Sequence, residues 1–498
     1  MQLVETHISW VLLTGEIAYK IKRPVQYPFV DLRSAQRRAF FCAEELRLNQ
    51  RFAAELYLDV CDVTSSAGVV QIGGPGAVIE RAVRMRQFDR RDELDRLLAS
   101  GRIELAELER FGADMAAIHA QLPVAQPDQG AGRPETVRTI LLENFEQCLQ
   151  AAAPFGTDAG LRALREPFLA RLEAAQPWIG ARLLEQRVRE CHGDLHSRNV
   201  VRHGGRLIAF DCMEFEPAFR WIDVADDIAF LLMDMEAQRC AAHAQAFRAG
   251  YLGRSGDYQA CRVLGLYETH RALVRAKIAA LEATSAADAT AREVALAQHR
   301  SYLDCAQRQL APRRPKLLLM HGLSGSGKTW LAQQLARSLG AVHVRSDVER
   351  KRLAGLAEAQ HSGSAIAQGL YAPEASERTY QHLAGCAADV LAGGYTVIVD
   401  ATFQRRAERE RMCEVAAQSG APLQLIHCHA ARPVLEQRMA ARNHAATDAS
   451  EADVSVLQWQ ETNRDPIGTD EHLAIIDADT ARADVVAAVL RQLGIGDG

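Results

Sequence analysis

The chain has 498 residues, of which 48% are hydrophobic and 24% are charged, and its formal net charge is -5. This composition is typical of a globular protein with proper hydrophobic cores. The small negative charge excludes a protein that coats nucleic acid or a membrane surface by bulk attraction. From the length alone we expect roughly three compact units of ~150 residues each.

The cysteines and the first residues bear on where the protein works. Eleven cysteines, an odd number without CxxC pairs or His/Cys ligand spacing, predict buried thiols in a reducing compartment and indicate no zinc site. The opening MQLVETHISWVLLTG has no basic segment and no long apolar core, and no run of 18 apolar residues occurs elsewhere. We therefore expect a cytoplasmic protein without membrane contact.

The first ninety residues predict a small sheet with one main helix. The expected elements are strands at Ile8–Leu13, Glu16–Ile21, Tyr57–Val63, Gly68–Ile72 and Ala77–Met85 and a helix from about Leu32 to Arg51. The first two strands form a hairpin across the turn Thr14–Gly15. Lys20 and Lys22 lie two residues apart on its second strand and so project from the same face. Glu44 and Glu45 on the helix are candidates to pair with one of these lysines.

A tightly spaced polar set follows in the run CHGDLHSRNVVRHGGRLIAFD at Cys191–Asp211. Asp194 is followed by Asn199, and two short apolar strands then lead to Asp211. A hydroxyl nucleophile needs a proton acceptor, and a transferred phosphoryl group needs metal ions held by oxygen atoms. The set therefore predicts phosphoryl transfer with Asp194 as general base and with Asn199 and Asp211 as Mg²⁺ ligands. His192 is expected to orient the loop.

The segments HGDLHSRN and IAFD resemble the aminoglycoside phosphotransferase and choline kinase group, whose fold is that of protein kinases. The resemblance covers about residues 1–305. It implies that Lys22, with Lys20 as the alternative, contacts the α- and β-phosphates of ATP and that Glu45 or Glu44 orients this lysine. It also implies that the turn at Thr14–Gly15 covers the phosphates. The chain departs from the pattern because it has no G-x-G-x-x-G at the hairpin and carries DCME after the second apolar strand.

Charged residues further along are expected to have structural or solvent roles. Asp223, Asp226 and Asp227 are predicted to make structural hydrogen bonds at the start of a helix, and Arg271, Arg275 and Lys277 to face solvent rather than line a substrate cleft. Two prolines in Ala311–Pro315 then mark a boundary. The predicted domains are residues 1–90 as a kinase-like N-lobe, 91–310 as a C-lobe, 311–315 as a linker and 316–498 as a P-loop domain.

The segment GLSGSGKT fits the phosphate-binding pattern G-x-x-x-x-G-K-[ST] at every fixed position. An apolar strand, Leu317–Met320, precedes it, and a helix that stops at Gly340 follows. Glycines let successive backbone N–H groups close around a polyphosphate at the positive end of the helix. Lys328 is expected to reach the β- and γ-phosphates, and the Thr329 hydroxyl to hold Mg²⁺. The predicted ATP-binding loop is Gly322, Leu323, Ser324, Gly325, Ser326, Gly327, Lys328 and Thr329.

Four further apolar runs after this loop alternate with helical patterns. They are Ala341–Arg345, Tyr395–Val399, Leu423–Cys428 and Leu473–Ile476. Together with the first strand they predict a doubly wound parallel sheet. A capping box at Ser346 and Glu349 is expected to open one helix, and Thr402 to cap another.

Three kinds of side chain in this region are candidates for chemistry. Asp347 follows the second strand and is a candidate general base for a hydroxyl acceptor, with stabilisation of the helix start as the alternative. Asp400 ends an apolar strand, which is the Walker-B pattern for an Mg²⁺ ligand. Arg438 and Arg442, on a helix that starts near Pro433, are candidate lid arginines that reach the transferred phosphate.

The segments SDVERKRL and VIVDATF make residues 316–498 similar to the P-loop kinases that phosphorylate small hydroxylated molecules or nucleic-acid ends. This group includes gluconate kinase, polynucleotide 5′-kinase and zeta toxin. The resemblance implies Asp347 as the base on the acceptor side and Arg438 or Arg442 as lid arginines.

The sequence thus predicts an α+β protein-kinase-like fold with a small β lobe and a helical lobe, followed by an α/β P-loop domain. We expect two sites that bind ATP and Mg²⁺ and transfer the γ-phosphoryl group to a hydroxyl of a small molecule. The acceptor, the preference for ATP or GTP and the oligomeric state stay open at this point. One alternative is a P-loop ATPase beside an N-terminal unit that senses a ligand without turnover. A nucleic-acid acceptor is not favoured, and it predicts a basic groove near Lys351, Arg352, Arg405 and Arg406.

Overall fold

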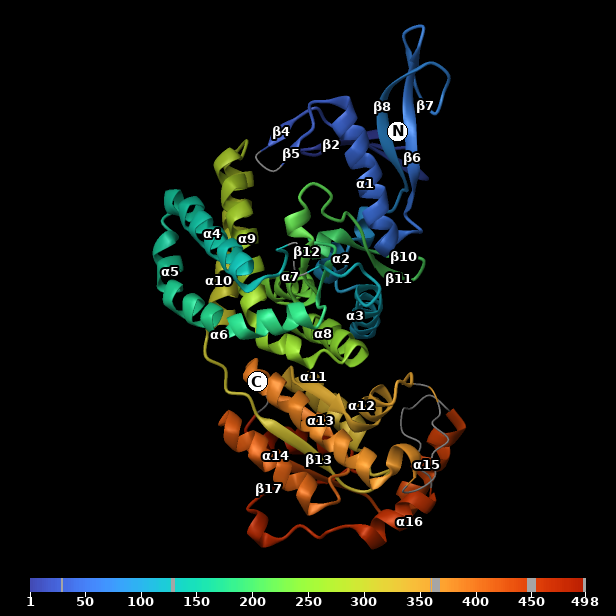
Figure 1. Cartoon of the computed structure of the whole chain (residues 1–498), viewed down its shortest axis with the longest axis vertical. Coiled ribbons are helices and arrows are strands. Elements are labelled where there is room, and N and C mark those ends of the chain that lie inside the picture. The colour runs from blue at the N-terminus through green and yellow to red at the C-terminus, as the bar shows by residue number, and fades with distance from the viewer. Residues whose placement is uncertain (28–29, 127–129, 359, 361–367, 446–453, 496–498) are drawn as a thin grey trace. The chain divides into compact units, whose positions relative to one another are not determined.

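The structure is a computed structural model and describes residues 1–27, 30–126, 130–358, 360, 368–445 and 454–495, with the backbone alone at 442–445 and 454 (Figure 1). The chain divides into two compact units. The first comprises Met1–Ser255 and Leu264–Leu310, and the second comprises Ala311–Gly498 together with the short segment Gly256–Val263.

The first unit begins with an antiparallel sheet in the strand order β1-β2-β3-β8-β6-β7. Its strands are β1 (Gln2–Glu5), β2 (Ser9–Leu13), β3 (Ile17–Lys22), β6 (Tyr57–Ser66), β7 (Val69–Ile72) and β8 (Ala77–Arg86), and the short pair β4 (Gln26–Tyr27) and β5 (Val30–Asp31) lies apart from it. Helix α1 (Ala35–Ala53) begins after Ser34, whose side chain accepts from the Arg37 N–H. Apolar residues of α1, including Cys42, pack with Leu56 and Val83 of the sheet region. The predicted small sheet with one main helix is confirmed.

The rest of the first unit is mainly helical. Its helices are α2 (Leu94–Ala99), α3 (Leu105–His119), α4 (Pro134–Ala152), α5 (Asp158–Ala163), α6 (Arg165–Leu184), α7 (Val224–Ala237), α8 (Ala241–Ser255), α9 (Cys261–Ser285, which begins in the second unit) and α10 (Ala289–Leu310). Two short antiparallel pairs join them, β10 (Val200–His203) with β11 (Arg206–Ala209) and β9 (Val188–Glu190) with β12 (Trp221–Asp223). Almost every residue of α7 is buried, including three aspartates.

The second unit contains a five-stranded parallel sheet in the order β14-β15-β13-β16-β17. Its strands are β13 (Leu317–His321), β14 (Val342–Arg345), β15 (Val397–Asp400), β16 (Leu423–His429) and β17 (Ala474–Asp479), and its helices are α11 (Lys328–Leu339), α12 (Ser346–Leu353), α13 (Pro373–Ala392), α14 (Arg406–Ser419), α15 (Arg432–Ala445), α16 (Val454–Asn463) and α17 (Val485–Gln492). All five residues of the central strand β13 are buried, and one face of the sheet forms a core with α11 and α17. The predicted doubly wound parallel sheet is confirmed.

Two predicted helix caps in this unit are wrong. Ser346 is the first residue of α12 rather than its cap, and the cap residue Arg345 makes no side-chain hydrogen bond there. Glu349 instead turns inward, where its carboxylate accepts from the Tyr258 hydroxyl at 3.1 Å. Thr402 lies before α14, which starts only at Arg406. In both places tertiary partners determine the conformation more strongly than the local capping pattern does.

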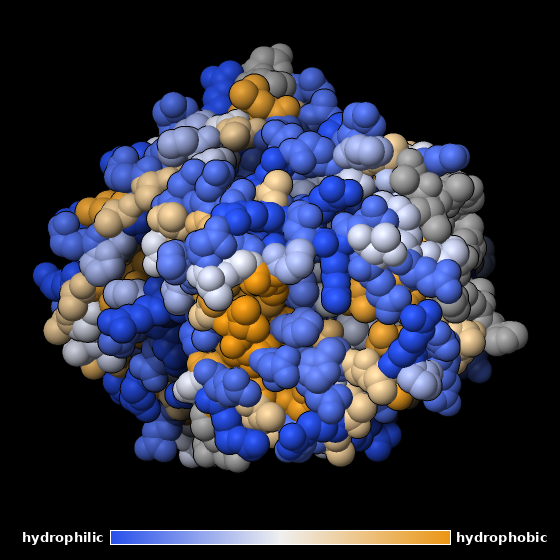
Figure 2. All heavy atoms as spheres, turned by 90° about the horizontal axis from the view of Figure 1, so that it is seen from below, coloured by the Kyte–Doolittle hydropathy of each residue, from blue (hydrophilic) through white to orange (hydrophobic). Residues whose placement is uncertain are grey.

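The face of the molecule in Figure 2 is mainly hydrophilic, as expected of a chain with 24% charged residues. Figure 2 shows one face covered mainly by hydrophilic residues, with a group of hydrophobic residues near its centre. Among the residues that the structure describes, no helix has the length and apolar character needed to cross a bilayer. All eleven cysteines are free thiols.

Helices α3 and α8 of the first unit approach each other closely at two glycines. A Cβ atom at Gly112 would lie 2.1 Å from the Phe247 carbonyl oxygen, and one at Gly250 would lie 1.8 Å from the Glu109 carbonyl oxygen. Backbone atoms at these distances cannot move aside without separating the helices. Glycine therefore sets the spacing of this helix pair.

We predict that Gly250→Ala destabilises the protein by about 1–3 kcal/mol, because the added methyl group overpacks the α3–α8 contact. Gly253→Ala in the same helix is the matched control, since a Cβ there meets no atom within 4 Å. It should stabilise the helix by up to about 1 kcal/mol through helix propensity. Calorimetric melting of the full chain compares them, and equal stability of the two variants would contradict the close contact.

Candidate functional site

A network of buried charges links the sheet and the helical part of the first unit. Lys20 Nζ lies 2.6 Å from Asp211 Oδ1 and 2.8 Å from Glu45 Oε1. Lys22 contacts Glu45 from the other side and also contacts Glu214. Burial by itself would raise the pKa of Glu45, but the charges of Lys20 and Lys22 lower it to about 2. Burial raises the pKa of Glu214 to about 7 in spite of Lys22.

The two lysines differ in what they can reach. Lys22 has no exposed side-chain area and is enclosed by two carboxylates, whereas the Lys20 side chain is 12% exposed. Asp211, the partner of Lys20, has 41% of its side chain exposed. Lys20 therefore lies at the open side of the network beside the predicted metal ligand, and Lys22 lies behind it. The sequence left the choice between these lysines open, and the geometry favours Lys20 for contact with phosphate.

The helix partner of the lysines is Glu45. Glu44, the alternative, contacts Arg47 at 2.6 Å and Arg220 at 3.0 Å instead. The turn at Thr14–Gly15 lies at the end of β3 away from Lys22, where the Gly15 N–H donates to Gln87. The register pairs Ser9 with Lys22, so the β1–β2 turn lies at the lysine end of the hairpin. The expectation that Thr14–Gly15 covers the phosphates is therefore wrong, because this turn lies at the opposite end of β3 from Lys22.

The loop after β9 carries the predicted catalytic residues. The Asn199 side-chain amide donates to the Asp194 carbonyl oxygen at 2.9 Å and to its carboxylate at 3.0 Å. This leaves the Asn199 side-chain oxygen as the atom for a cation. Burial by itself would raise the pKa of Asp194, but nearby His196, together with His192 and Arg275, lowers it to about 2. Asp194 is therefore ionised and able to accept a proton.

His192 holds this loop in place. Its Nε2–H donates to the Phe210 carbonyl oxygen at 2.9 Å, and its Nδ1 accepts from the Asp194 N–H at 3.3 Å. Burial lowers the pKa of His192, so the ring is neutral. Asp227 accepts from the backbone N–H groups of His192 and Gly193 at 3.1 and 2.8 Å. The loop is thus fixed from both sides.

Asp211 has a backbone conformation that is rare for its residue type. Its φ is +62°, in the left-handed region that disfavours side chains with a Cβ. The Asp211 N–H donates to the Tyr57 hydroxyl at 3.2 Å, and the next N–H, of Cys212, donates to Asn49 at 2.9 Å. Partners from the sheet and from α1 therefore hold the strained residue beside Lys20.

The predicted structural aspartates do make buried ion pairs. Asp223 contacts Arg182 at 2.6 Å, and Asp226 contacts Arg271 at 2.7 Å. The expectation that Arg271 faces solvent is wrong, because it is buried and its guanidinium lies 4.9 Å from the Phe230 ring centroid. Arg275 is half-buried, with its guanidinium 5.5 Å from the Tyr302 ring centroid.

The glycine loop of the second unit lies against neighbouring backbone. Gly322, Gly325 and Gly327 have φ values of +138°, +79° and +82°, in the region that favours glycine. A Cβ at Gly322 would lie 2.2 Å from the Cys428 carbonyl oxygen, and one at Gly325 would lie 2.9 Å from that of Leu435. Only glycine fits these positions, so the loop conformation follows from the sequence.

The expected cation ligands lie next to this loop. The Thr329 hydroxyl hydrogen-bonds the Asp400 carboxylate, and Asp400 lies in register with Met320 at the end of β13. His343 Nε2 also contacts Asp400, at 3.2 Å. Burial by itself would raise the pKa of Asp400, but its bond to His343 and the charge of Lys328 contribute to lowering it. Asp400 is therefore an ionised oxygen ligand beside a hydroxyl, a donor set that suits Mg²⁺.

Arg438 lies next to the glycine loop. Its guanidinium donates to the Thr480 hydroxyl at 2.8 Å and to the Thr480 carbonyl oxygen at 2.9 Å, and the Thr480 hydroxyl donates to the Ser326 carbonyl oxygen at 2.8 Å. The side chain of Arg442 lies outside the described residues. Asp347 is half-buried after β14, which ends beside Asp400.

Several residues of these sites were missed from the sequence. Glu214 and His343 contact predicted site residues, and Gln460 accepts from the Ser324 N–H at 2.9 Å. The only sequence signal for Glu214 is its place in DCME, and this signal is weak. The signal for His343 is that it is a polar residue at an alternating position of the strand next to that of Asp400. Gln460 has no signal, because it is far away in sequence.

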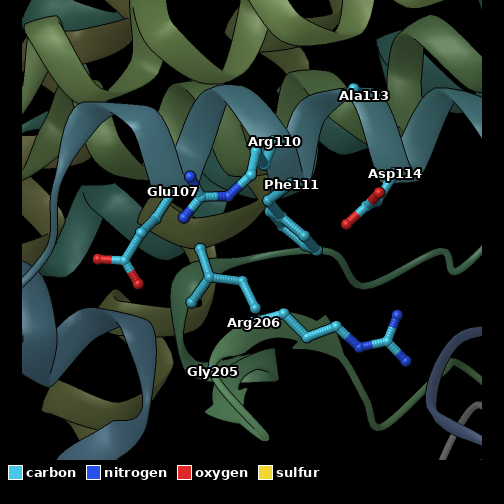
Figure 3. Close-up of a pocket in the computed structure, with 8 residues that line it drawn as sticks. Glu107, Arg110, Phe111, Ala113, Asp114, Gly205 and Arg206 are labelled. Atoms are coloured by element: carbon cyan, nitrogen blue, oxygen red, sulfur yellow. The ribbon is translucent and has the colours of Figure 1, made fainter.

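A separate hollow of about 390 Å³ lies between α3 and the β10–β11 turn. Figure 3 shows the side chains of Glu107, Phe111 and Asp114 on α3 above Arg206. Its lining contains none of the predicted site residues. The sites for chemistry therefore rest on the contacts above and not on this hollow.

Comparison with known proteins supports the two-part organisation. Residues 32–264 match the phosphotransferase enzyme family, and residues 317–467 match the AAA domain family. Uncharacterised proteins of Mycobacterium tuberculosis and Mycobacterium bovis are 27% identical over 467 residues, which is 93% of this chain and 90% of theirs.

Several solved structures are similar to part of the chain. A putative kinase from Chloroflexus aurantiacus is 21% identical and covers 38% of this chain and 100% of its own, with a TM-score of 0.30. A gluconokinase from Sinorhizobium meliloti is 22% identical and covers 36% and 93%, with a TM-score of 0.27. The phosphotransferase match thus falls mainly on the first unit, and the AAA-domain match falls on the second.

Proposed function

We propose that each unit binds ATP with Mg²⁺ and transfers its γ-phosphoryl group to a hydroxyl of a small molecule. The observation that carries this proposal is that each unit brings a lysine for phosphate and oxygen ligands for a cation together. These are Lys20 with Asp211 in the first unit and Lys328 with Thr329 and Asp400 in the second. Phosphoryl transfer requires both a positive side chain that binds the phosphates and oxygen ligands that hold the metal ion.

In the first unit, the oxygen of the acceptor hydroxyl attacks the γ-phosphorus of ATP, and Asp194 takes the proton of that hydroxyl. The bond between the γ-phosphorus and the oxygen that leaves with ADP breaks. Its low pKa keeps the carboxylate ionised, and Asn199 fixes its orientation. Asn199 and Asp211 would hold Mg²⁺, which neutralises phosphate charge when bound. Lys20 is the phosphate contact, and Lys22 with Glu45 and Glu214 holds Lys20 in position.

In the second unit, the glycine loop binds the phosphates and Lys328 reaches the transferred group. In the structure Lys328 Nζ donates to the Leu323 carbonyl oxygen at 2.8 Å, a bond that a phosphate oxygen replaces. Thr329 and Asp400 would hold Mg²⁺, and Asp347 would accept the proton of the acceptor. The contacts of Arg438 with Thr480, whose hydroxyl bonds Ser326, support a role for this arginine on the nucleotide side of the loop.

The charge distribution favours a small acceptor over a nucleic-acid end. Lys351 is buried and donates to the Glu358 carbonyl oxygen, and Arg352 contacts Glu349. Arg406 contacts Glu410 and Asp470, both at 2.7 Å. Three of the four residues expected to form a basic groove, Lys351, Arg352 and Arg406, thus have nearby anionic or carbonyl partners. A ligand-sensing first unit is the remaining alternative, and the ionised Asp194 beside Asn199 favours turnover over sensing.

We expect two ATP-binding events per chain in isothermal titration calorimetry with Mg²⁺. Lys328→Ala should remove one event, and Asp194→Ala combined with Asp211→Ala should weaken the other. Radiolabelled ATP and a panel of hydroxylated small molecules then identify the acceptor of each site. A single binding event, lost with Lys328→Ala alone, would contradict a nucleotide site in the first unit.

Asp194→Asn in the full chain should lower phosphoryl transfer by the first unit by about 10²–10⁴, because the general base is lost while the side-chain shape is kept. ATP affinity should stay nearly unchanged. Asp158→Asn, at the start of α5 and paired with Arg162, is the matched control and should leave the rate unaltered. Single-turnover kinetics measure the chemical step, and a rate unchanged in Asp194→Asn would rule out the assigned base.

The two lysines should respond differently to substitution by methionine. Lys20→Met should weaken ATP binding by the first unit with a modest loss of stability. Lys22→Met should cost about 3–5 kcal/mol of folding free energy, because it leaves Glu45 and Glu214 buried without this cation. Calorimetric melting and ATP titration separate the two effects. The reverse pattern would make Lys22 the phosphate contact.

A further inference from the structure

Four metal-ligating side chains that phosphoryl transfer does not use gather on one face of the second unit's sheet. His321 ends β13, His427 and His429 lie on β16, and Asp477 lies on the edge strand β17. The parallel register sets His321, His427 and Asp477 abreast on three neighbouring strands. His429 follows His427 by two residues and so lies on the same face.

The side chains contact one another directly. His427 Nδ1 lies 3.1 Å from Asp477 Oδ1, and His429 Nε2 lies 2.9 Å from Asp477 Oδ2. The ring centroids of His321 and His427 are 5.1 Å apart, and those of His427 and His429 are 5.5 Å apart. Three imidazoles and one carboxylate therefore occupy a small volume.

His321 adds an observation that points to a ligand. Its side chain is 93% buried, and its Nδ1 has no hydrogen-bond partner within the described parts of the chain. A buried nitrogen without a partner costs free energy, and a bound cation could relieve that cost.

We propose that His427, His429 and Asp477, with the buried His321 on the neighbouring strand β13, bind a divalent transition-metal ion such as Zn²⁺. Such an ion takes imidazole nitrogen and carboxylate oxygen at about 2.0–2.2 Å, so two of its ligand atoms lie about 3 Å apart. The nitrogen to oxygen distances above have this spacing, although each joins one histidine to a different oxygen of Asp477 and is also a hydrogen-bond length. His427, His429 and Asp477 have 37%, 41% and 69% of their side chains exposed, so they can turn toward one ion without disturbing the core.

This site differs in chemistry from the one at Thr329 and Asp400. Mg²⁺ prefers hard oxygen ligands, whereas imidazole suits Zn²⁺, Co²⁺ and Ni²⁺. His321 directly precedes Gly322, so an ion held here would join the ends of β13, β16 and β17 beside the glycine loop. It would stabilise the strand ends that support nucleotide binding.

The set on β13, β16 and β17 is not among the groups in the described chain whose ligand atoms already lie within 4.8 Å of one another, so its exposed side chains must turn to bind one ion. Two groups do have this spacing, and each includes a cysteine. They are His119, Cys191 and Asp227 in the first unit and Glu349, His382 and Cys386 in the second. Their carboxylates accept hydrogen bonds from groups other than the potential ligands, Asp227 from the loop backbone and Glu349 from Arg352 and Tyr258, whereas the contacts of Asp477 given above are with the potential ligands themselves. Burial raises the pKa of Cys191 and of Cys386, which keeps both thiols protonated. A metal ion bound at either of these groups would have a thiolate ligand, whereas one at the proposed site would not.

The test is a titration of the full, chelator-treated chain with Co²⁺ in excess Mg²⁺, followed by calorimetry and visible absorption. We expect one Co²⁺ per chain, with ligand-field bands and no thiolate charge-transfer band. His427→Ala and His429→Ala should each weaken Co²⁺ binding at least ~10-fold, and the double variant should abolish it. His203→Ala, on β10 of the first unit, is the control and should bind as the wild type does.

Thermal melting provides the second readout. Zn²⁺ should raise the melting temperature of the wild type and of His203→Ala but not that of the double variant, since only the folded site binds. If the double variant is misfolded without metal, the exposed Asp477→Asn replaces it and should also weaken binding. The proposal is overturned if the wild type binds no Co²⁺, if a thiolate band appears, or if folded His427→Ala, His429→Ala and Asp477→Asn variants bind unchanged.

Discussion

A carboxylate with no contact to water must be paired with a cation, and Glu45 is the carboxylate on which the first unit depends. It lies on α1 between two lysines of β3, and these lysines reach Asp211 and Glu214 in the loop after β11. One helix, one strand and one loop are thereby held together by charge. The same pairing gives Lys20 its position beside Asp211, so the stability of the lobe and the geometry of the site have one cause.

The two units use different folds but a similar local arrangement at the predicted metal ligand. In the first unit Asp211 itself has a left-handed backbone, and in the second Phe403, three positions after Asp400, has one. Neither residue is glycine, and each conformation is held by surrounding hydrogen bonds, from Asp211 to Tyr57 and from Phe403 to Tyr380. Strain of this kind persists where the surroundings fix it, which is common at functional sites.

The sequence was sufficient for the fold of both units, because apolar periodicity and the glycine loop are local signals. It also identified Asp194, Asn199, Asp400 and Thr329 as residues to examine, and the structure places each pair in contact. It could not choose between Lys20 and Lys22, since both project from one face of β3 and burial alone separates them. The wrong caps at Ser346 and Thr402 have the same origin, because distant partners such as Tyr258 are invisible to a local pattern. The histidines of β16 were equally visible as an alternating pair, but Asp477 joins them only through strand pairing.

The short segment Gly256–Val263 lies in sequence far from the rest of the unit to which it belongs. Tyr258 in this segment bonds Glu349, and Arg262 contacts Asp389 at 2.5 Å. Expressing residues 311–498 alone would therefore strip the P-loop unit of two of its own side-chain partners, leaving Glu349 buried without the tyrosine hydroxyl. A fragment that begins at the proline-rich linker would expose the surface that Gly256–Val263 covers in the full chain. Loss of activity in such a fragment would therefore give no information about the activity of the full chain.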